Sequence, residues 1–114
     1  MGKGAHLGEF EEIVLLAVAR HAAAGHGAAI HEEILTTTGR DVSIPAVYVT
    51  LSRLEKKGYV ATSVDAGDEA RGGRPRKLFA LTELAVRELR EARLVHARLW
   101  DGLAFDPLAS GESR

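Results

Sequence analysis

The spacing of apolar residues along the 114-residue chain predicts four helices, with two strands before the last helix. Within each helix the apolar residues recur every three or four positions, which places them on one face of the helix. The strand segments are rich in β-branched and aromatic residues and flank a loop of glycine, proline and charged residues, a pattern typical of a hairpin. The expected helices are residues 7–24, 28–38, 44–57 and 83–102, and the expected strands are residues 59–64 and 77–81.

Residues that stop or cap helices lie at the ends of these segments. Gly39 and Gly58 follow the second and third helices, where glycine commonly ends a helix. Ser43 and Thr82 precede the third and last helices and carry the hydroxyl groups that helix N-termini favour. Residues 25–27 (Gly-His-Gly) predict the end of the first helix and a tight turn.

The composition excludes several classes of protein. Hydrophobic residues make up 46% of the chain and charged residues 27%, which is ordinary for one globular domain. No cysteine is present, so disulfides and thiolate metal sites are excluded. No apolar run reaches the roughly 18 residues of a membrane span, and residues 1–10 lack the pattern of a signal peptide. We therefore expect a cytoplasmic protein without a membrane segment.

The sequence contains no pattern for catalysis, a metal or a cofactor. It has no P-loop, no dinucleotide-binding fingerprint and no recognisable set of Ser, His and Asp. His21, His26 and His31 are five residues apart with glycines between them, unlike the four-residue spacing of a helical metal pair. We therefore expect neither an enzyme nor a bound metal or cofactor.

The distribution of charge is more informative than its sum. The net charge of −1 does not by itself favour nucleic acid. However, residues 53–77 contain seven basic and four acidic residues. A nearly neutral protein that collects its positive charge in one segment can bind a polyanion through that segment.

The third expected helix has two unlike faces. Ile44, Val47, Leu51 and Leu54 recur at helical spacing on the side that would face a core. The opposite side is small, hydroxylated and basic, which suits a DNA groove but is equally compatible with a solvated outer face. The candidate DNA-contacting residues of this segment are Ser43, Ala46, Tyr48, Val49, Thr50, Ser52, Arg53, Lys56 and Lys57.

The order of elements predicts a mainly α fold with a small β-hairpin (α+β). This order is that of a winged helix-turn-helix, in which the third helix enters the major groove and the hairpin tip contacts the DNA backbone or minor groove. The tip of this hairpin, Arg-Gly-Gly-Arg-Pro-Arg-Lys, collects positive charge on an extended loop. A loop that only improves solubility is the alternative. The candidate DNA-contacting residues of the wing are Arg71, Arg74, Arg76 and Lys77.

The last expected helix carries apolar residues at heptad spacing from Ala85 to Leu103. An apolar stripe about 30 Å long is too exposed for a small domain to cover, so a symmetric second copy is expected to bury it. A helix folded back onto its own domain is the alternative. His96 would be a pH-sensitive or a simply hydrogen-bonded group there. The candidate dimer-interface residues are Phe10, Val14, Leu89, Ala92, His96, Leu99, Trp100 and Leu103.

These elements divide the chain into three expected parts. Residues 1–82 form the DNA-binding domain and residues 83–105 form the dimerisation helix. Residues 106–114 are polar and are expected to be a disordered tail.

Three stretches carry a family resemblance: Leu7–Val18 (LGEFEEIVLLAV), Ala46–Val60 (AVYVTLSRLEKKGYV) and Arg71–Thr82 (RGGRPRKLFALT). Together with the amphipathic last helix, they make nearly the whole chain similar to the short PadR-family transcriptional regulators. The resemblance implies a homodimeric winged-helix DNA-binding protein, usually a repressor, whose last helix packs against the partner subunit. Because some members respond to ligands, Trp100 has two open roles: packing in the dimer, or stacking on a small aromatic effector between subunits.

The sequence therefore predicts a homodimeric, sequence-specific repressor that binds a pseudo-palindromic operator in double-stranded DNA. Relief of repression by a small-molecule effector at the dimer interface is an option that the resemblance leaves open. The alternative function is a winged-helix protein–protein adaptor that does not bind DNA.

Overall fold

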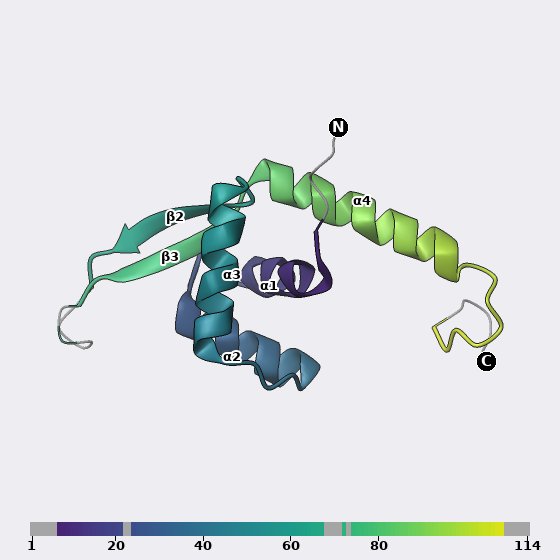
Figure 1. Ribbon diagram of the computed structural model, residues 1–114, viewed down its shortest axis with the longest axis horizontal. Helices are drawn as coiled ribbons and strands as arrows, with labels where there is room; N and C mark the ends of the chain where they lie inside the picture. The colour runs from purple at the N-terminus through teal and green to yellow at the C-terminus, as the bar shows by residue number, and fades with distance from the viewer. Residues whose placement is uncertain (1–6, 22–23, 68–71, 73, 109–114) are drawn as a thin grey trace.

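The computed structural model describes residues 7–21, 24–67, 72 and 74–108 of the chain. Within them, four helices and a three-stranded antiparallel sheet make up the fold (Figure 1). The predicted order of helices and hairpin is confirmed, and one further strand precedes the second helix. The elements are α1 (Glu9–Ala19), β1 (Gly25–His26), α2 (Gly27–Thr38), α3 (Ile44–Lys56), β2 (Val60–Asp65), β3 (Arg76–Leu81) and α4 (Glu83–Trp100).

The predicted caps form at the ends of the helices. The Ser43 hydroxyl accepts a hydrogen bond from the Ala46 N–H at 3.1 Å, and the Thr82 hydroxyl accepts one at the start of α4. Gly39 and Gly58 have φ angles of 75° and 85°, so each ends a helix in the left-handed region that side chains disfavour. Local sequence chemistry therefore accounts for most of the element boundaries.

The prediction for the end of the first helix was wrong. Helix α1 ends at Ala19, and the Gly-His pair after it forms strand β1 instead of a tight turn. In this strand Gly25 pairs with Phe79 and His26 pairs with Leu78, so β3 becomes the central strand of the order β1-β3-β2. A two-residue strand carries no periodicity in the sequence, and its partner lies about fifty residues away.

The core lies where α1, α2 and α3 meet the sheet. Ile44, which was expected to face inward, is 46% exposed in the first turn of α3. The buried apolar residues are Val14, Leu15, Ala17, Val18, Ile30, Ile34, Val47, Leu51, Leu54, Tyr59, Val60, Phe79 and Ala85.

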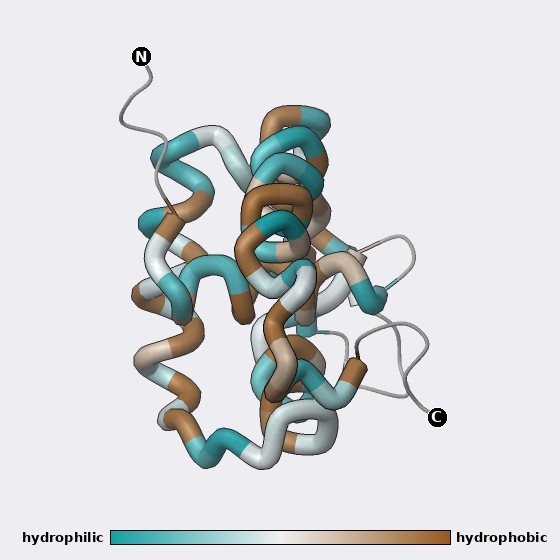
Figure 2. Tube along the Cα trace, turned by 90° about the vertical axis from the view of Figure 1, so that its right-hand side faces the viewer, coloured by the Kyte–Doolittle hydropathy of each residue, from teal (hydrophilic) through white to brown (hydrophobic). Residues whose placement is uncertain are grey.

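Helix α4 leaves this body instead of covering it. In Figure 1 the β2–β3 hairpin and α4 extend from the helical body in opposite directions. The radius of gyration is 16.6 Å, whereas a compact chain of this length would have about 13 Å. In Figure 2, viewed from the end to which α4 extends, hydrophobic and hydrophilic positions alternate along this helix. This arrangement is that of a winged helix-turn-helix with an additional C-terminal helix.

The chain turns sharply after α4. The Phe105 ring packs edge-on against Trp100, with 5.6 Å between the ring centroids, and the Leu108 N–H donates to the Asp106 carboxylate. The predicted disordered tail lies mostly at 109–114, outside the described residues. Among the helices that the structure describes, none has the length and apolar character needed to cross a membrane.

Candidate nucleic-acid interface

The outer face of α3 forms a shallow hollow of about 450 Å³, which we call the recognition hollow. Five of the predicted DNA-contacting residues line it, and they recur at spacings of one, three and four along the helix, so one side of α3 carries all of them. This side combines a valine, two hydroxyl groups and two cations. Such a mixture can contact both bases and phosphates. The recognition hollow is lined by Tyr48, Val49, Ser52, Arg53 and Lys56.

Thr50 does not belong to this exposed face, which corrects the prediction for that residue. Its exposed fraction is 4%, because it lies beside Val47, Leu51 and Leu54 on the side of α3 that packs against the core. Thr50 follows Val47 by three residues and precedes Leu54 by four, so helical spacing places it on the core side. Ala46, also predicted to contact DNA, is exposed.

Lys57 is also not directed to the outer face. Its ammonium donates to Glu11 Oε2 at 2.8 Å, which joins the end of α3 to the start of α1. Burial raises the pKa of Glu11, but hydrogen bonds from Lys57 and the Gly8 N–H outweigh that effect and hold the pKa below its ordinary value. Because this cation is already paired with Glu11 of its own chain, we do not propose Lys57 as a DNA contact.

The wing begins on β3, where two of its predicted cations are fixed by strand pairing. In the β2–β3 register Arg76 lies opposite Asp65 and Lys77 lies opposite Val64. The Lys77 ammonium is 3.4 Å from Glu55 of α3, an exposed pair of the kind that contributes at most about 1 kcal/mol. This contact ties the base of the wing to α3.

Of the two remaining predicted wing cations, the structure describes one. Arg74 is exposed just before β3. Arg71, which was also predicted to contact DNA, lies outside the described residues.

A second hollow, of about 500 Å³, lies between the wing and the helix-turn-helix, and we call it the wing hollow. Tyr48 lines both hollows, so the two surfaces are continuous at this residue. His26 and Ala28 of the wing hollow were not foreseen from the sequence, because only the pairing of β1 with β3 brings the start of α2 to the wing. The wing hollow is lined by His26, Ala28, Tyr48, Pro75, Arg76 and Lys77.

Contacts around the turn between α2 and α3 hold the recognition helix in place. His31 Nε2–H donates to the Val42 carbonyl at 2.7 Å, and Arg40 pairs with Glu9 of α1 at 3.0 Å. His26 has a separate task, because its Nδ1 accepts from the Ala29 N–H as the N-cap of α2. In the described part of the chain no three metal-ligating side chains lie together.

Comparison with known proteins agrees with this geometry. The family model described as the transcriptional regulator PadR-like family matches residues 15–91, which is more than half of the chain. The chain belongs to the PadR-like family. No curated protein matches it.

Solved structures of PadR-like regulators share the fold. A PadR-family regulator from Eggerthella lenta DSM 2243 is 27% identical, with a TM-score of 0.63 over 80% of this chain and 79% of that chain. The structure of a RosR-S4 complex is 22% identical, with a TM-score of 0.68 over 88% of this chain and 79% of that one. A PadR-like transcription factor from Bacteroides fragilis is 21% identical, with a TM-score of 0.66 over 79% and 82% of the two chains.

The predicted dimer-interface residues of this PadR-like chain fall into two groups. Leu99 (69% exposed), Trp100 (46%), Leu103 (38%) and His96 lie on the exposed part of α4 or just after it. Nearer the domain, Phe10 and Leu89 are partly buried against the core of their own chain, and Ala92 is partly buried as well.

Val14, on α1, was also predicted to lie in the dimer interface, and this prediction needs correction. Its exposed fraction is 0%, because it packs in the core of its own chain. The residue is therefore not available to a second subunit.

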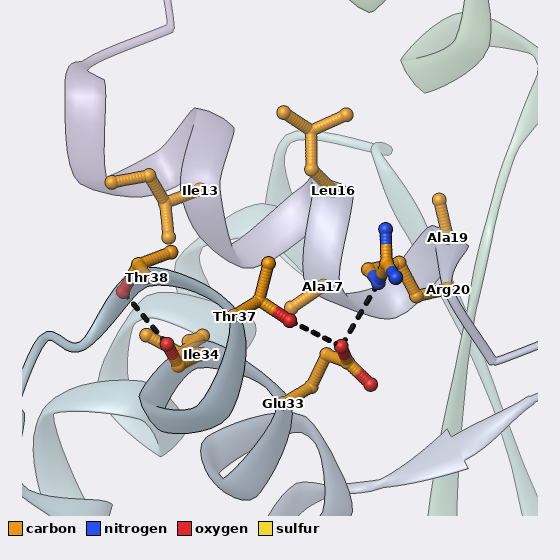
Figure 3. Close-up of a pocket in the computed structure, with 9 residues that line it drawn as sticks. All are labelled: Ile13, Leu16, Ala17, Ala19, Arg20, Glu33, Ile34, Thr37 and Thr38. Atoms are coloured by element: carbon orange, nitrogen blue, oxygen red, sulfur yellow. Dashed lines mark hydrogen bonds and ion pairs between the residues drawn. The ribbon is translucent and has the colours of Figure 1, made fainter.

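A groove between α1 and α2, with a volume of about 350 Å³, lies on the outward side of these helices (Figure 3). Its wall is largely apolar, and Leu16, 49% exposed, projects from α1 at its edge. At the polar end, Arg20 Nε and the Thr37 hydroxyl both donate to Glu33, at 2.9 and 2.6 Å. The Thr37 hydrogen bond is the main reason that the pKa of Glu33 is lowered. Leu16 thus gives α1 an apolar residue that points away from its own core.

Proposed function

We propose that this protein is a homodimeric, sequence-specific DNA-binding repressor that occupies a pseudo-palindromic operator. The observation that carries the proposal is that Tyr48 is shared by the recognition hollow and the wing hollow. The cations of α3 and those of the wing therefore border one continuous surface. A duplex is the partner that fits a helix and a basic wing presented side by side.

Each part of that surface has a role in the proposed complex. Arg53, Lys56, Arg74 and Arg76 neutralise phosphates, and Lys77 adds to them at the base of the wing. The groove-facing residues at the start of α3 are small or apolar, and few of them bear strong hydrogen-bonding groups. We therefore expect shape and backbone contacts to supply most of the affinity, with modest base readout. The groove-facing residues are Ser43, Ala46, Tyr48, Val49 and Ser52.

The proposed dimer uses the exposed stripe of α4 together with the outward side of α1. Leu99, Trp100 and Leu103 are exposed in the single chain, and Leu16 offers a matching apolar residue on α1. A twofold axis through this interface gives the dimer two recognition helices. They would read half-sites about 34 Å apart, one turn of the double helix.

Regulation is proposed at the same interface. A small aromatic effector that stacks on Trp100 between the subunits would change the angle between the two recognition helices and release the operator. The proposal includes no catalytic activity and no cofactor, and places the protein in the cytoplasm with the DNA.

The test is a gel-shift titration with the genomic DNA fragments that the purified protein retains. If two subunits each contribute five cations, about ten phosphates are neutralised. The logarithm of the association constant should then fall with a slope of about −9 against the logarithm of salt concentration. A neutral competitor of equal size serves as the control for non-electrostatic binding. Salt-independent retention would contradict the proposal, and no retention of any duplex at low salt would favour the protein–protein adaptor instead.

A further inference from the structure

The first residue of α2, Gly27, lies directly beneath the ring of Tyr48 from α3. Gly27 is buried, and a Cβ placed on it would overlap the ring and hydroxyl of Tyr48 well inside van der Waals contact. By contrast, nothing lies near the corresponding positions of Gly39 and Gly72. The absence of a side chain at Gly27 therefore lets the outer end of the phenol approach the start of α2.

The packing of this ring sets where its hydroxyl lies. Tyr48 is 43% exposed, so one side of the side chain faces solvent while the other rests on Gly27. The same side chain lines the wing hollow with Arg76 and Lys77 of β3. Strand β1, paired with β3 immediately before Gly27, keeps the start of α2 at a fixed place beside the wing. Three elements far apart in the sequence thus meet around one tyrosine.

We propose that Gly27 is a positioning residue for DNA binding and that the wing hollow seats one backbone phosphate of the duplex. Tyr48 donates its hydroxyl to a phosphate oxygen, and Arg76 and Lys77 supply the positive charge. A phosphate suits the wing hollow because the donor and the two cations converge from the helix and the wing. This inference rests on the proposed DNA binding and adds to it a specific contact and the residue that orients it.

The test is a double-mutant cycle with Gly27→Ala, Tyr48→Ala and the double variant, measured by fluorescence anisotropy on a retained duplex. Gly27→Ala should weaken binding of the dimer about 100-fold, roughly tenfold for the hydrogen bond to a charged group that each subunit loses. In the Tyr48→Ala background the same change should have no further effect, because no ring remains to be displaced. Thr36→Ser, an exposed position of α2 outside both hollows, is the control and should bind like the wild type.

The thermal unfolding midpoint separates positioning from damage to the fold. Only the outer end of the Tyr48 side chain opposes the new methyl group, so the ring should swing aside with little loss of stability. Alanine in place of glycine in a helix adds stability where space allows, and the double variant should show this gain. Gly27→Ala with a wild-type midpoint and weakened binding would support the positioning role.

Tyr48→Phe tests the hydroxyl alone. It keeps the ring and the charge, so binding of the dimer should weaken about 100-fold, roughly tenfold for each subunit, while the salt dependence stays the same. Wild-type affinity of Tyr48→Phe would overturn the phosphate contact, and equal losses from Gly27→Ala in both backgrounds would overturn the positioning role. If the wild type itself binds no duplex, the proposed function fails instead.

Discussion

Helices α1 and α4 are both amphipathic, yet their apolar faces end in opposite environments. In α1, Val14, Leu15 and Val18 are at most 1% exposed. In α4, by contrast, Leu99 is 69% exposed, although it belongs to the regular apolar heptad from Ala85 to Leu103. The difference arises because α2, α3 and β3 surround α1, whereas α4 touches its own domain only near its first turns.

This difference shows that an apolar stripe predicts that a helix face will be buried. It does not predict whether the same chain or a second chain buries it. For α1 the neighbours lie in the same domain, and the stripe becomes its core. For α4 the chain extends away from the core, so burial requires a second copy. Four predictions test the contrast, from the largest expected effect to the smallest.

The first prediction concerns the helix that is already covered. Leu15→Ala should lower the free energy of unfolding by about 2–5 kcal/mol, because it removes a fully buried side chain and leaves a cavity. Urea denaturation measured at low protein concentration checks this value. A loss below 1 kcal/mol would mean that α1 does not lie in a packed core.

The second prediction concerns the uncovered helix. Leu99→Ala should raise the dimer dissociation constant about 100-fold, roughly tenfold for the leucine that each subunit loses from the interface, and should leave the stability of the monomer almost unchanged. Sedimentation equilibrium measures the dissociation constant. Val64→Ala on the hairpin is the matched control, because Val64 has the same 69% exposure. Equal behaviour of the two variants would contradict a dimer through α4.

The third prediction compares arginines of the wing with arginines of α4 in their effect on DNA binding. Replacing Arg74 and Arg76 by alanine should weaken binding to all duplexes alike and reduce the salt slope by about 4 per dimer, since phosphate contacts carry no sequence information. Gel shifts at several salt concentrations measure that slope. Arg87 and Arg90 on α4, replaced in the same way, should leave it unchanged. A change in sequence preference without a change in slope would speak against phosphate contacts by the wing.

The fourth prediction, with the smallest expected effect, compares the pH-dependent contributions of Glu11 on α1 and Glu91 on α4 to the free energy of unfolding. Because the folded-state pKa of Glu11 lies below that of the unfolded chain, its ion pair with Lys57 stabilises fully above about pH 4.3 and is lost as the pH falls through the folded value. Glu11→Gln should therefore be less stable than the wild type at pH 7, and the gap should close towards pH 3. Urea denaturation at each pH measures the gap. Glu91→Gln, exposed on α4, should show no such gap.

Much of the fold could be predicted from the sequence because its signals are local. The Ser43 and Thr82 caps, the glycine stops and the hydrophobic period of α3 depend on residues within a few positions of one another. The residues that line the recognition hollow could be predicted from the same helical period, since Tyr48, Ser52 and their neighbours recur on one side of a helix.

Only the tertiary structure decided the contacts between distant segments. The Lys57 ammonium pairs with Glu11 of α1, forty-six residues away in the sequence. The pairing of β1 with β3 and the space that Gly27 leaves for Tyr48 carry no local pattern. The sequence alone determined which segments are helical and which faces are apolar. The pairing of one apolar or polar face with another depended on tertiary packing. Contact free energies depend on residues that are close in space, whether or not they are close in the sequence.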